Sequence, residues 1–219
     1  MVMKALVIDG SPEPSSPTLV AWLAEDRDFI VAVDHGAVVC HAAGIVPNLF
    51  VGDEDSIDPL TRAWVHENAG RIVKLEVEKD ATDLGVALAC VEEEAERRGD
   101  VVDLTLTCAT GGRPDHALAV IGLLAQYRKM VPDLVEDDYD MCILSPEGLD
   151  SWEFTGEIGK TFSAIALEPG TSISIDGMRW NLDGFDLPLL SDRGVSNIIL
   201  EDGAKVWCEE GCLAAFLIK

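Results

Sequence analysis

Short apolar runs alternate with amphipathic segments over the first two thirds of the chain. The apolar runs predict buried strands at residues 4–9, 29–33, 49–51, 71–75, 101–107 and 141–144. Helical patterns lie between them, at residues 18–25, 37–43, 59–68, 82–98 and 115–130. The helix over 82–98 is the best defined, because Thr82 suits an N-cap and Leu84, Leu88 and Val91 share one apolar face. This alternation predicts an α/β domain with a mostly parallel sheet.

The pattern changes near residue 151. From there, short β-prone runs at 161–167, 171–176, 195–200, 204–207 and 213–218 are separated by turns that contain glycine. These runs predict an all-β part, built as a sandwich or a flattened barrel. We therefore predict two domains, an α/β domain over residues 1–148 and an all-β, sandwich-like domain over residues 149–219.

The composition narrows the classes of function. The chain has 219 residues, of which 48% are hydrophobic, so it can bury a core. Its 16 basic and 40 acidic residues give a net charge of −24, which makes nucleic acids and anionic membranes unfavourable partners. No apolar run approaches the ~20 residues that span a bilayer, and the N-terminus has the pattern of a strand, so we expect a cytoplasmic protein.

The six cysteines form no C-x-x-C pair and lie largely in apolar segments. We expect them to be reduced core residues. The spacing of Cys208 and Cys212 fits a disulfide and equally fits a hairpin that joins two short strands.

Acidic side chains follow the predicted strands at several points. They are Asp34, Asp53, Asp55, Asp83 and Asp115. The carboxyl ends of parallel strands lie at one edge of a sheet, so these turns can meet in space, where their carboxylates need a hard cation such as Mg²⁺ to be stable together. Each residue taken alone could equally be a helix cap or part of a surface turn, and only the set favours a metal site.

A second group of turn residues suits phosphate. Gly111 and Gly112 lie between a predicted strand and a predicted helix, where small residues let the backbone approach an anion. Arg113 follows them and can hold phosphate with two hydrogen bonds, and Lys79 is a basic residue in another of the turns. The sequence contains no Walker phosphate-binding motif.

In the all-β part, Trp180 could stack on a flat cationic ring, with Ser196 and Asn197 supplying hydrogen bonds. A position in a strand core explains Trp180 slightly better. The residues alone leave both interpretations open.

Six short motifs occur in one order along nearly the whole chain. They are D-H-G-A at 34–37, P-N-L-F-V-G-D-E-D-S at 47–56, K-D-A-T-D at 79–83, G-G-R-P-D-H at 111–116, G-M-R-W-N-L at 177–182 and S-N at 196–197. Each motif is modest by itself. Together they resemble the motifs of the thiamine pyrophosphokinase family.

This resemblance implies a homodimer whose α/β domain binds ATP and magnesium, with thiamine at the subunit interface against the all-β domain. It implies transfer of a diphosphoryl group from ATP to the hydroxyl of thiamine, which gives thiamine diphosphate and AMP. Carried over motif by motif, the resemblance implies that Mg²⁺ is held by Asp53, Asp55 and Asp83, and that ATP and its phosphates are bound by Asp34, Lys79, Thr82, Gly111, Gly112 and Arg113. It implies that the catalytic residues are Asp83, Asp115 and Arg113. It implies that thiamine is bound by Trp180, Ser196 and Asn197.

Three positions depart from the pattern of that family. His35 replaces a glycine, Asn48 an aspartate, and Glu54 an apolar or aromatic residue, and none of these changes removes an implied ligand. Rival functions are a related diphosphokinase that acts on a hydroxymethyl-pterin, a non-catalytic regulator that binds nucleotide or thiamine, and a magnesium-dependent phosphohydrolase. The motifs around Trp180 and Asn197 favour thiamine over the pterin.

Overall fold

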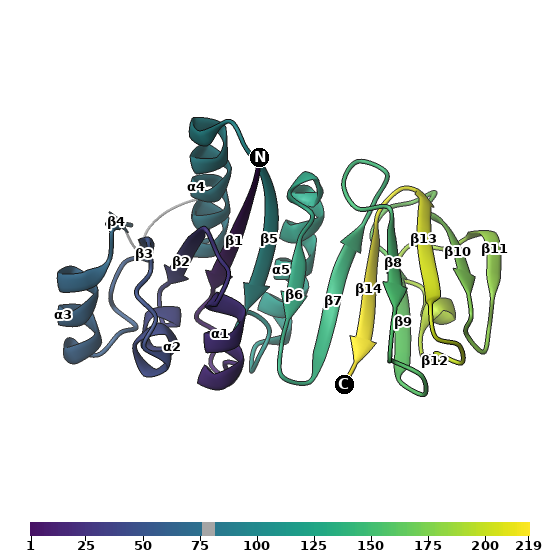
Figure 1. Ribbon diagram of the computed structural model, residues 1–219, viewed down its shortest axis with the longest axis horizontal. Helices are drawn as coiled ribbons and strands as arrows, with labels where there is room; N and C mark the ends of the chain where they lie inside the picture. Colours follow the sequence, from purple (N-terminus) through teal and green to yellow (C-terminus); the bar gives the residue numbers. More distant parts are fainter. Residues whose placement is uncertain (76–81) are drawn as a thin grey trace. The chain divides into compact units, whose positions relative to one another are not determined.

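The computed structural model describes residues 1–75 and 82–219 (Figure 1). The chain divides into two compact units, Met1–Val120 and Ile121–Lys219. The division falls inside helix α5 (Pro114–Gln126), and each unit is described by itself.

The first unit is built on five parallel strands. They are β1 (Val2–Ile8), β2 (Phe29–Val33), β3 (Leu49–Gly52), β4 (Arg71–Lys74) and β5 (Val101–Thr107), in the spatial order β5-β1-β2-β3-β4. Strand β1 lies between β2 and β5, and its register aligns Ile8 with Ala32 on one side and Thr107 on the other. The ends of these three strands therefore lie side by side, as the parallel sheet predicted from the sequence requires.

Helices connect these strands: α1 (Pro17–Ala24), α2 (Gly36–Ala43), α3 (Pro59–Asn68), α4 (Asp83–Arg98) and the start of α5. Leu6, Val7 and Ile8 are all fully buried although successive strand residues point to opposite faces, so both faces of the sheet are covered. Helix α4 packs on β1, β2, β3 and β5 (Figure 1). With both faces filled, the loops at the carboxyl ends of the strands remain to form a site.

Side-chain caps set where the helices begin. Asp58 Oδ1 accepts hydrogen bonds from the amides of Leu60 and Thr61 at the start of α3, and Ser16 Oγ accepts one from Leu19 in α1. These polar residues stand just before helical patterns, which explains why the sequence predicts the helix starts to within one or two residues.

The second unit is all-β apart from the end of α5 and two short 3₁₀ turns, among them η1 (Arg128–Met130). One set of neighbouring strands has the order β12-β9-β14-β7-β6, and its members are β6 (Asp133–Val135), β7 (Tyr139–Leu144), β9 (Thr161–Ala166), β12 (Asn197–Ile198) and β14 (Leu213–Ile218). A separate sheet has the order β11-β10-β13-β8, and its members are β8 (Ser151–Phe154), β10 (Ser172–Asp176), β11 (Leu182–Asp186) and β13 (Ala204–Glu210). Phe154, Phe162 and Ile173 belong to the core of this unit.

The predicted fold class is confirmed, and the structure changes two details. Residues 141–144, expected as the last strand of the α/β domain, lie in β7, which pairs antiparallel with β14. In this pairing Cys142 lies opposite Ala215, which is 73 residues later and beyond the reach of a local pattern. The helix expected to reach residue 130 ends at Gln126, and η1 follows it. The contacts within the chain divide it between residues 120 and 121. The predicted domain boundary at residue 148 stays a prediction.

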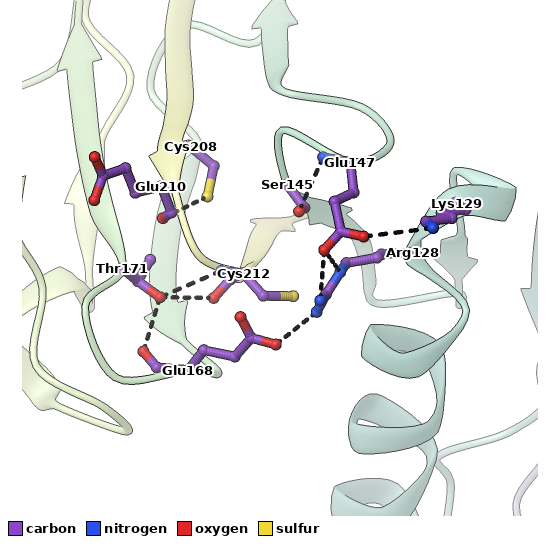
Figure 2. Close-up of polar contacts among 9 residues, drawn as sticks. All are labelled: Arg128, Lys129, Ser145, Glu147, Glu168, Thr171, Cys208, Glu210 and Cys212. Carbon is purple, nitrogen blue, oxygen red and sulfur yellow. Dashed lines mark hydrogen bonds and ion pairs between the residues drawn. The ribbon is translucent and has the colours of Figure 1, made fainter.

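Arg128 ties three segments of the second unit together (Figure 2). Its Nε donates to Glu147 Oε1 at 2.8 Å, and its Nη1 donates to Glu168 Oε1 at 2.6 Å. Lys129 Nζ lies 3.7 Å from the other oxygen of Glu147. These partners lower the pKa of Glu147, first through the hydrogen bond from Arg128, so its carboxylate is compensated within the fold.

Candidate functional site

Asp34 stands at the end of β2 in a backbone conformation that few residues adopt. Its φ is 45°, and its amide donates to the carbonyl of Val51 in the neighbouring strand β3 at 3.0 Å. Gly52 lies beside it, and a Cβ at that position would be 2.0 Å from Asp34 Oδ1. Glycine at position 52 therefore leaves the space that this carboxylate occupies.

The carboxylate of Asp34 is crowded by other acids. Burial, followed by the charge of Asp83, its hydrogen bond and the charge of Asp53, raises the pKa of Asp34 to about 7, although the backbone amide of Asp53 partly offsets this. Among the residues that the structure describes, no hydrogen-bond partner reaches the buried Asp34 Oδ1. Two of the four carboxylates expected to meet Asp34, those of Asp53 and Asp83, thus lie near it.

These oxygens have the chemistry that Mg²⁺ prefers, since they belong to carboxylates. Within residues 1–75 and 82–219, however, no group of three or more His, Cys, Asp or Glu side chains is already arranged so that it could hold a metal ion. Asp53 Oδ1 accepts a hydrogen bond from the amide of Asp55 at 3.0 Å, and Asp55 is exposed. A shared ion therefore requires side-chain rotations in this turn.

Glu54 lies in the same turn but has cationic partners. It is buried, its φ is 67°, and its two carboxylate oxygens lie 2.9 Å from His66 Nε2 and 3.0 Å from Lys74 Nζ. Burial opposes its ionisation, but the hydrogen bonds and charges of Lys74 and His66 outweigh burial and lower its pKa. Glu54, which differs from the family pattern, is therefore part of the local packing.

The other two departing positions also have structural partners. His35 Nδ1 lies 3.1 Å from the carbonyl oxygen of Ser56 and so links the start of α2 to the acidic turn. Asn48 Oδ1 accepts a hydrogen bond from the amide of Ile30 at 2.7 Å.

The segment before α4 contains two of the expected phosphate ligands. Thr82 is the N-cap of α4, and its hydroxyl oxygen accepts a hydrogen bond from the amide of Gly85 at 3.1 Å. Asp83 follows it in the first turn of the helix, where a negative charge is favourable. Lys79 lies outside the described residues. The phosphate-binding roles of Thr82 and Lys79 stay predictions.

Arg113 and Asp115 pair with each other. Nε and Nη2 of Arg113 donate to the two carboxylate oxygens of Asp115 at 2.9 and 2.7 Å, and both side chains are exposed. The hydrogen bond from Arg113 is the main cause of a lowered pKa of Asp115. The Nη1 group of Arg113 takes no part in this pair and can still donate to a phosphate, and Asp115 is a weak proton acceptor while the pair is closed.

In the second unit, Asn197 holds the backbone around Trp180. Asn197 Oδ1 accepts from the amide of Trp180 at 3.1 Å, and its Nδ2 donates to the carbonyl of Trp180 at 2.8 Å. The Trp180 ring is about half exposed, with the Arg179 guanidinium 5.6 Å from its centroid. Ser196 has a φ of 65°, and its amide donates to Ser163 Oγ at 3.1 Å. Two of the three residues expected to bind thiamine are thus in contact, and the strand-core alternative for Trp180 does not describe its exposed ring.

All six cysteines are buried thiols, and none of them, all within the described residues, forms a disulfide. None of the helices in the described parts of the chain combines the length and apolar character needed to cross a bilayer.

A model of the thiamin pyrophosphokinase catalytic domain matches residues 20–135, more than half of the chain. The chain belongs to the thiamin pyrophosphokinase family. A model of the vitamin B1 binding domain of thiamin pyrophosphokinase matches residues 153–213. The two matches cover most of both units, and the family predicted from the six motifs is confirmed.

Individual thiamine pyrophosphokinases agree with this assignment. The thiamine pyrophosphokinase of Bacillus subtilis is 33% identical over 118 residues, 54% of this chain and 52% of that protein. Thiamine pyrophosphokinase 1 of Oryza sativa subsp. japonica is 26% identical over 164 residues, 73% of this chain and 62% of that protein. The chain thus matches between half and two thirds of the length of these relatives. The crystal structure of the Bacillus subtilis thiamine pyrophosphokinase has the same fold, with a TM-score of 0.83 at 24% identity over 99% of both chains.

Proposed function

We propose that the protein transfers a diphosphoryl group from ATP to the hydroxyl of thiamine and releases AMP. Membership of the thiamin pyrophosphokinase family supports this reaction class. The observation that carries the proposal to this chain is the crowded carboxylate of Asp34, whose buried Oδ1 has no hydrogen-bond partner among the described residues and whose charge a bound cation would stabilise. The same reaction on a hydroxymethyl-pterin is less favoured, because the second unit matches a vitamin B1 binding domain.

Asp53, Asp55 and Asp83 would hold Mg²⁺, with Asp34 beside them. The bound ion would neutralise the triphosphate, which the net charge of −24 otherwise repels. The chain contributes further positive charge through Lys79 and Arg113. Thr82, Gly111 and Gly112 complete the phosphate contacts, the glycines by letting backbone approach the anion.

Asp83 is the better candidate for orienting or deprotonating the thiamine hydroxyl. Asp115, the other candidate, is paired with Arg113, which holds its pKa low. If phosphate binding draws Arg113 away, Asp115 becomes available only once ATP is in place. Arg113 would then stabilise charge on the transferred group.

Thiamine would bind against Trp180, Ser196 and Asn197. The exposed ring of Trp180 offers an apolar face for a cationic heterocycle, and Asn197 fixes the backbone that carries this ring. We expect a homodimer in which the partner subunit covers this region, since apolar side chains at Leu190, Val195 and Leu200 are also exposed here in the second unit. We expect the enzyme to work in the cytoplasm.

An assay that follows AMP, ADP and free phosphate separates the candidate functions. The protein is incubated with ATP and Mg²⁺, together with thiamine, with hydroxymethyl-pterin, or with no acceptor. AMP that forms only with thiamine is the expected result. AMP that forms only with the pterin, phosphate release without acceptor, or binding without turnover would each replace the proposal with the corresponding rival.

A further inference from the structure

Ser11 carries a buried hydroxyl in the loop between β1 and α1. Ser11 is 7% exposed, and no hydrogen-bond partner for its Oγ exists among the residues that the structure describes. A buried hydroxyl that has lost its bonds to water destabilises the fold unless something else bonds to it. Such groups are rare, and they mark places where a ligand or an ordered water completes the bonding.

Contacts of the backbone place Ser11 between two turns of the candidate site. The amide of Ser11 donates to the carbonyl of Cys108, just after β5, at 3.0 Å. On the other side, a Cβ on Gly10 would lie 2.8 Å from the amide nitrogen of His35, in the turn after β2. Because β1 lies between β2 and β5, Ser11 occupies the centre of the edge at which the three strands end.

The same loop lies against the glycine turn proposed to bind phosphate. A Cβ on Gly111 would be 1.8 Å from the carbonyl oxygen of Glu13, and a Cβ on Gly112 would be 3.1 Å from Pro12 Cβ. The two glycines thus allow residues 12 and 13 to pack on this turn. A ligand that reaches Gly111 and Gly112 also reaches the neighbourhood of Ser11.

Two unsatisfied oxygens therefore lie at adjacent strand ends, Ser11 Oγ after β1 and Asp34 Oδ1 after β2. The carboxylate oxygen suits a cation, whereas the hydroxyl can donate to an anion. A neutral donor can bind a phosphate oxygen here at a smaller desolvation cost than a buried lysine or arginine.

We propose that Ser11 binds the nucleotide, its hydroxyl donating a hydrogen bond to a phosphate oxygen of ATP. This inference rests on the proposed function and adds a residue to it. Ser11 lies before the residues matched by the catalytic-domain model, which begin at residue 20. Its role is therefore inferred from the contacts of this chain.

The test is binding of α,β-methylene-ATP with Mg²⁺, measured by calorimetry on the full chain. Ser11→Ala should weaken binding about tenfold or more, the usual effect of losing a hydrogen bond to a charged group. Ser11→Thr, which keeps the hydroxyl, should bind more tightly than Ser11→Ala. In the absence of nucleotide, Ser11→Ala should melt at the same or a higher temperature than the wild type, because it removes an unsatisfied group.

Ser145→Ala is the matched control. Ser145 is a buried serine of the second unit, and its Oγ accepts a hydrogen bond from the amide of Glu147 at 3.3 Å. This variant should melt at a lower temperature and bind the nucleotide like the wild type. A melting temperature that falls in Ser145→Ala but not in Ser11→Ala distinguishes a structural hydroxyl from a ligand-binding one.

Wild-type affinity in Ser11→Ala would overturn the inference, as would a lowered melting temperature with unchanged binding. Either result leaves the proposed function standing if the wild type still forms AMP with thiamine. A wild-type protein that binds no α,β-methylene-ATP would overturn both.

Discussion

Carboxylates around Asp34 and around Arg128 differ both in their exposure and in their partners. In the second unit, Glu147 and Glu168 each receive a hydrogen bond from Arg128 (Figure 2). In the first unit, Asp34 faces Asp83 and Asp53, and its pKa is raised to about 7. The carboxylates around Arg128 are compensated by a cation, whereas the carboxylate of Asp34 lies beside other acids that raise its pKa.

The difference separates acids that have a cationic partner from a carboxylate whose neighbours are acidic, and we propose a functional role for the second kind. A fold gains nothing from placing several carboxylates together, because their repulsion and desolvation both oppose folding. Such an arrangement is retained where a ligand supplies the missing charge. Glu54 sharpens the contrast, because it stands between Asp53 and Asp55 and yet is paired with Lys74 and His66.

The largest effect is expected from Asp83→Asn. This change removes a charge from the crowded group while keeping the size of the side chain, so AMP formation with thiamine should fall about 10³-fold. The circular dichroism spectrum should match the wild type, since an uncharged residue fits the first turn of α4. Near-normal turnover would show that Asp83 is not a catalytic residue.

The next effect is the response of stability to Mg²⁺. An ion that binds only the folded state at 100 times its Kd should raise the free energy of unfolding by about 2.7 kcal/mol. Thermal melts at pH 8 with and without Mg²⁺ measure this gain, and Asp34→Asn should remove most of it. An equal gain in the variant would place the ion elsewhere.

The raised pKa of Asp34 determines whether Asp34→Asn raises or lowers the free energy of unfolding without Mg²⁺. The folded-state pKa of about 7 lies above the ordinary value, so ionisation of Asp34 costs stability as pH rises from about 4 to above 7. Without Mg²⁺, the variant should therefore gain stability relative to the wild type at pH 8 and little at pH 4. A gain of the same size at both pH values would contradict this account.

Arg128→Met tests the compensated group. It leaves Glu147 and Glu168 without their main partner, and with partial solvent screening the free energy of unfolding should fall by about 1–2 kcal/mol. Urea denaturation measures this loss. The control is Arg97→Met, which breaks an exposed pair with Glu94 and should have a smaller effect. Equal losses would mean that the Arg128 contacts are ordinary surface ion pairs.

Local patterns were sufficient to predict most of the first unit. Strands of consecutive apolar residues, and polar caps such as Thr82 and Asp58 before helical segments, are set by neighbours in the sequence. The convergence of Asp34, Asp53 and Asp83 also followed, because parallel strands bring their carboxyl ends to one edge. The binding roles of these residues remain predictions.

Partners distant in sequence could not be predicted. Glu54 contacts Lys74 because β3 and β4 pair in parallel. Asn197 contacts Trp180, which lies 17 residues earlier in the sequence. Likewise, nothing near residues 141–144 in the sequence reveals their antiparallel pairing with β14. The lack of a hydrogen-bond partner for Ser11 Oγ among the described residues is also a property of the packed loop, which no local pattern reveals.

The smallest effect is expected from Glu54→Gln, which tests whether the role of Glu54 differs from the roles proposed for Asp53 and Asp55. Lys74 and His66 outweigh burial and lower the pKa of Glu54, so its charge stabilises the fold above about pH 4, and this contribution is lost as pH falls through the lowered pKa. At pH 7 the variant should lose about 1 kcal/mol, because both partners are largely exposed. Urea denaturation at pH 7 and pH 3 should show a smaller difference from the wild type at pH 3.

AMP formation by Glu54→Gln should stay within about twofold of the wild type, since removing a compensated charge leaves the proposed ion site unchanged. If turnover instead fell as far as in Asp83→Asn, Glu54 would belong to the reacting group and its pairing with Lys74 and His66 would not be merely structural.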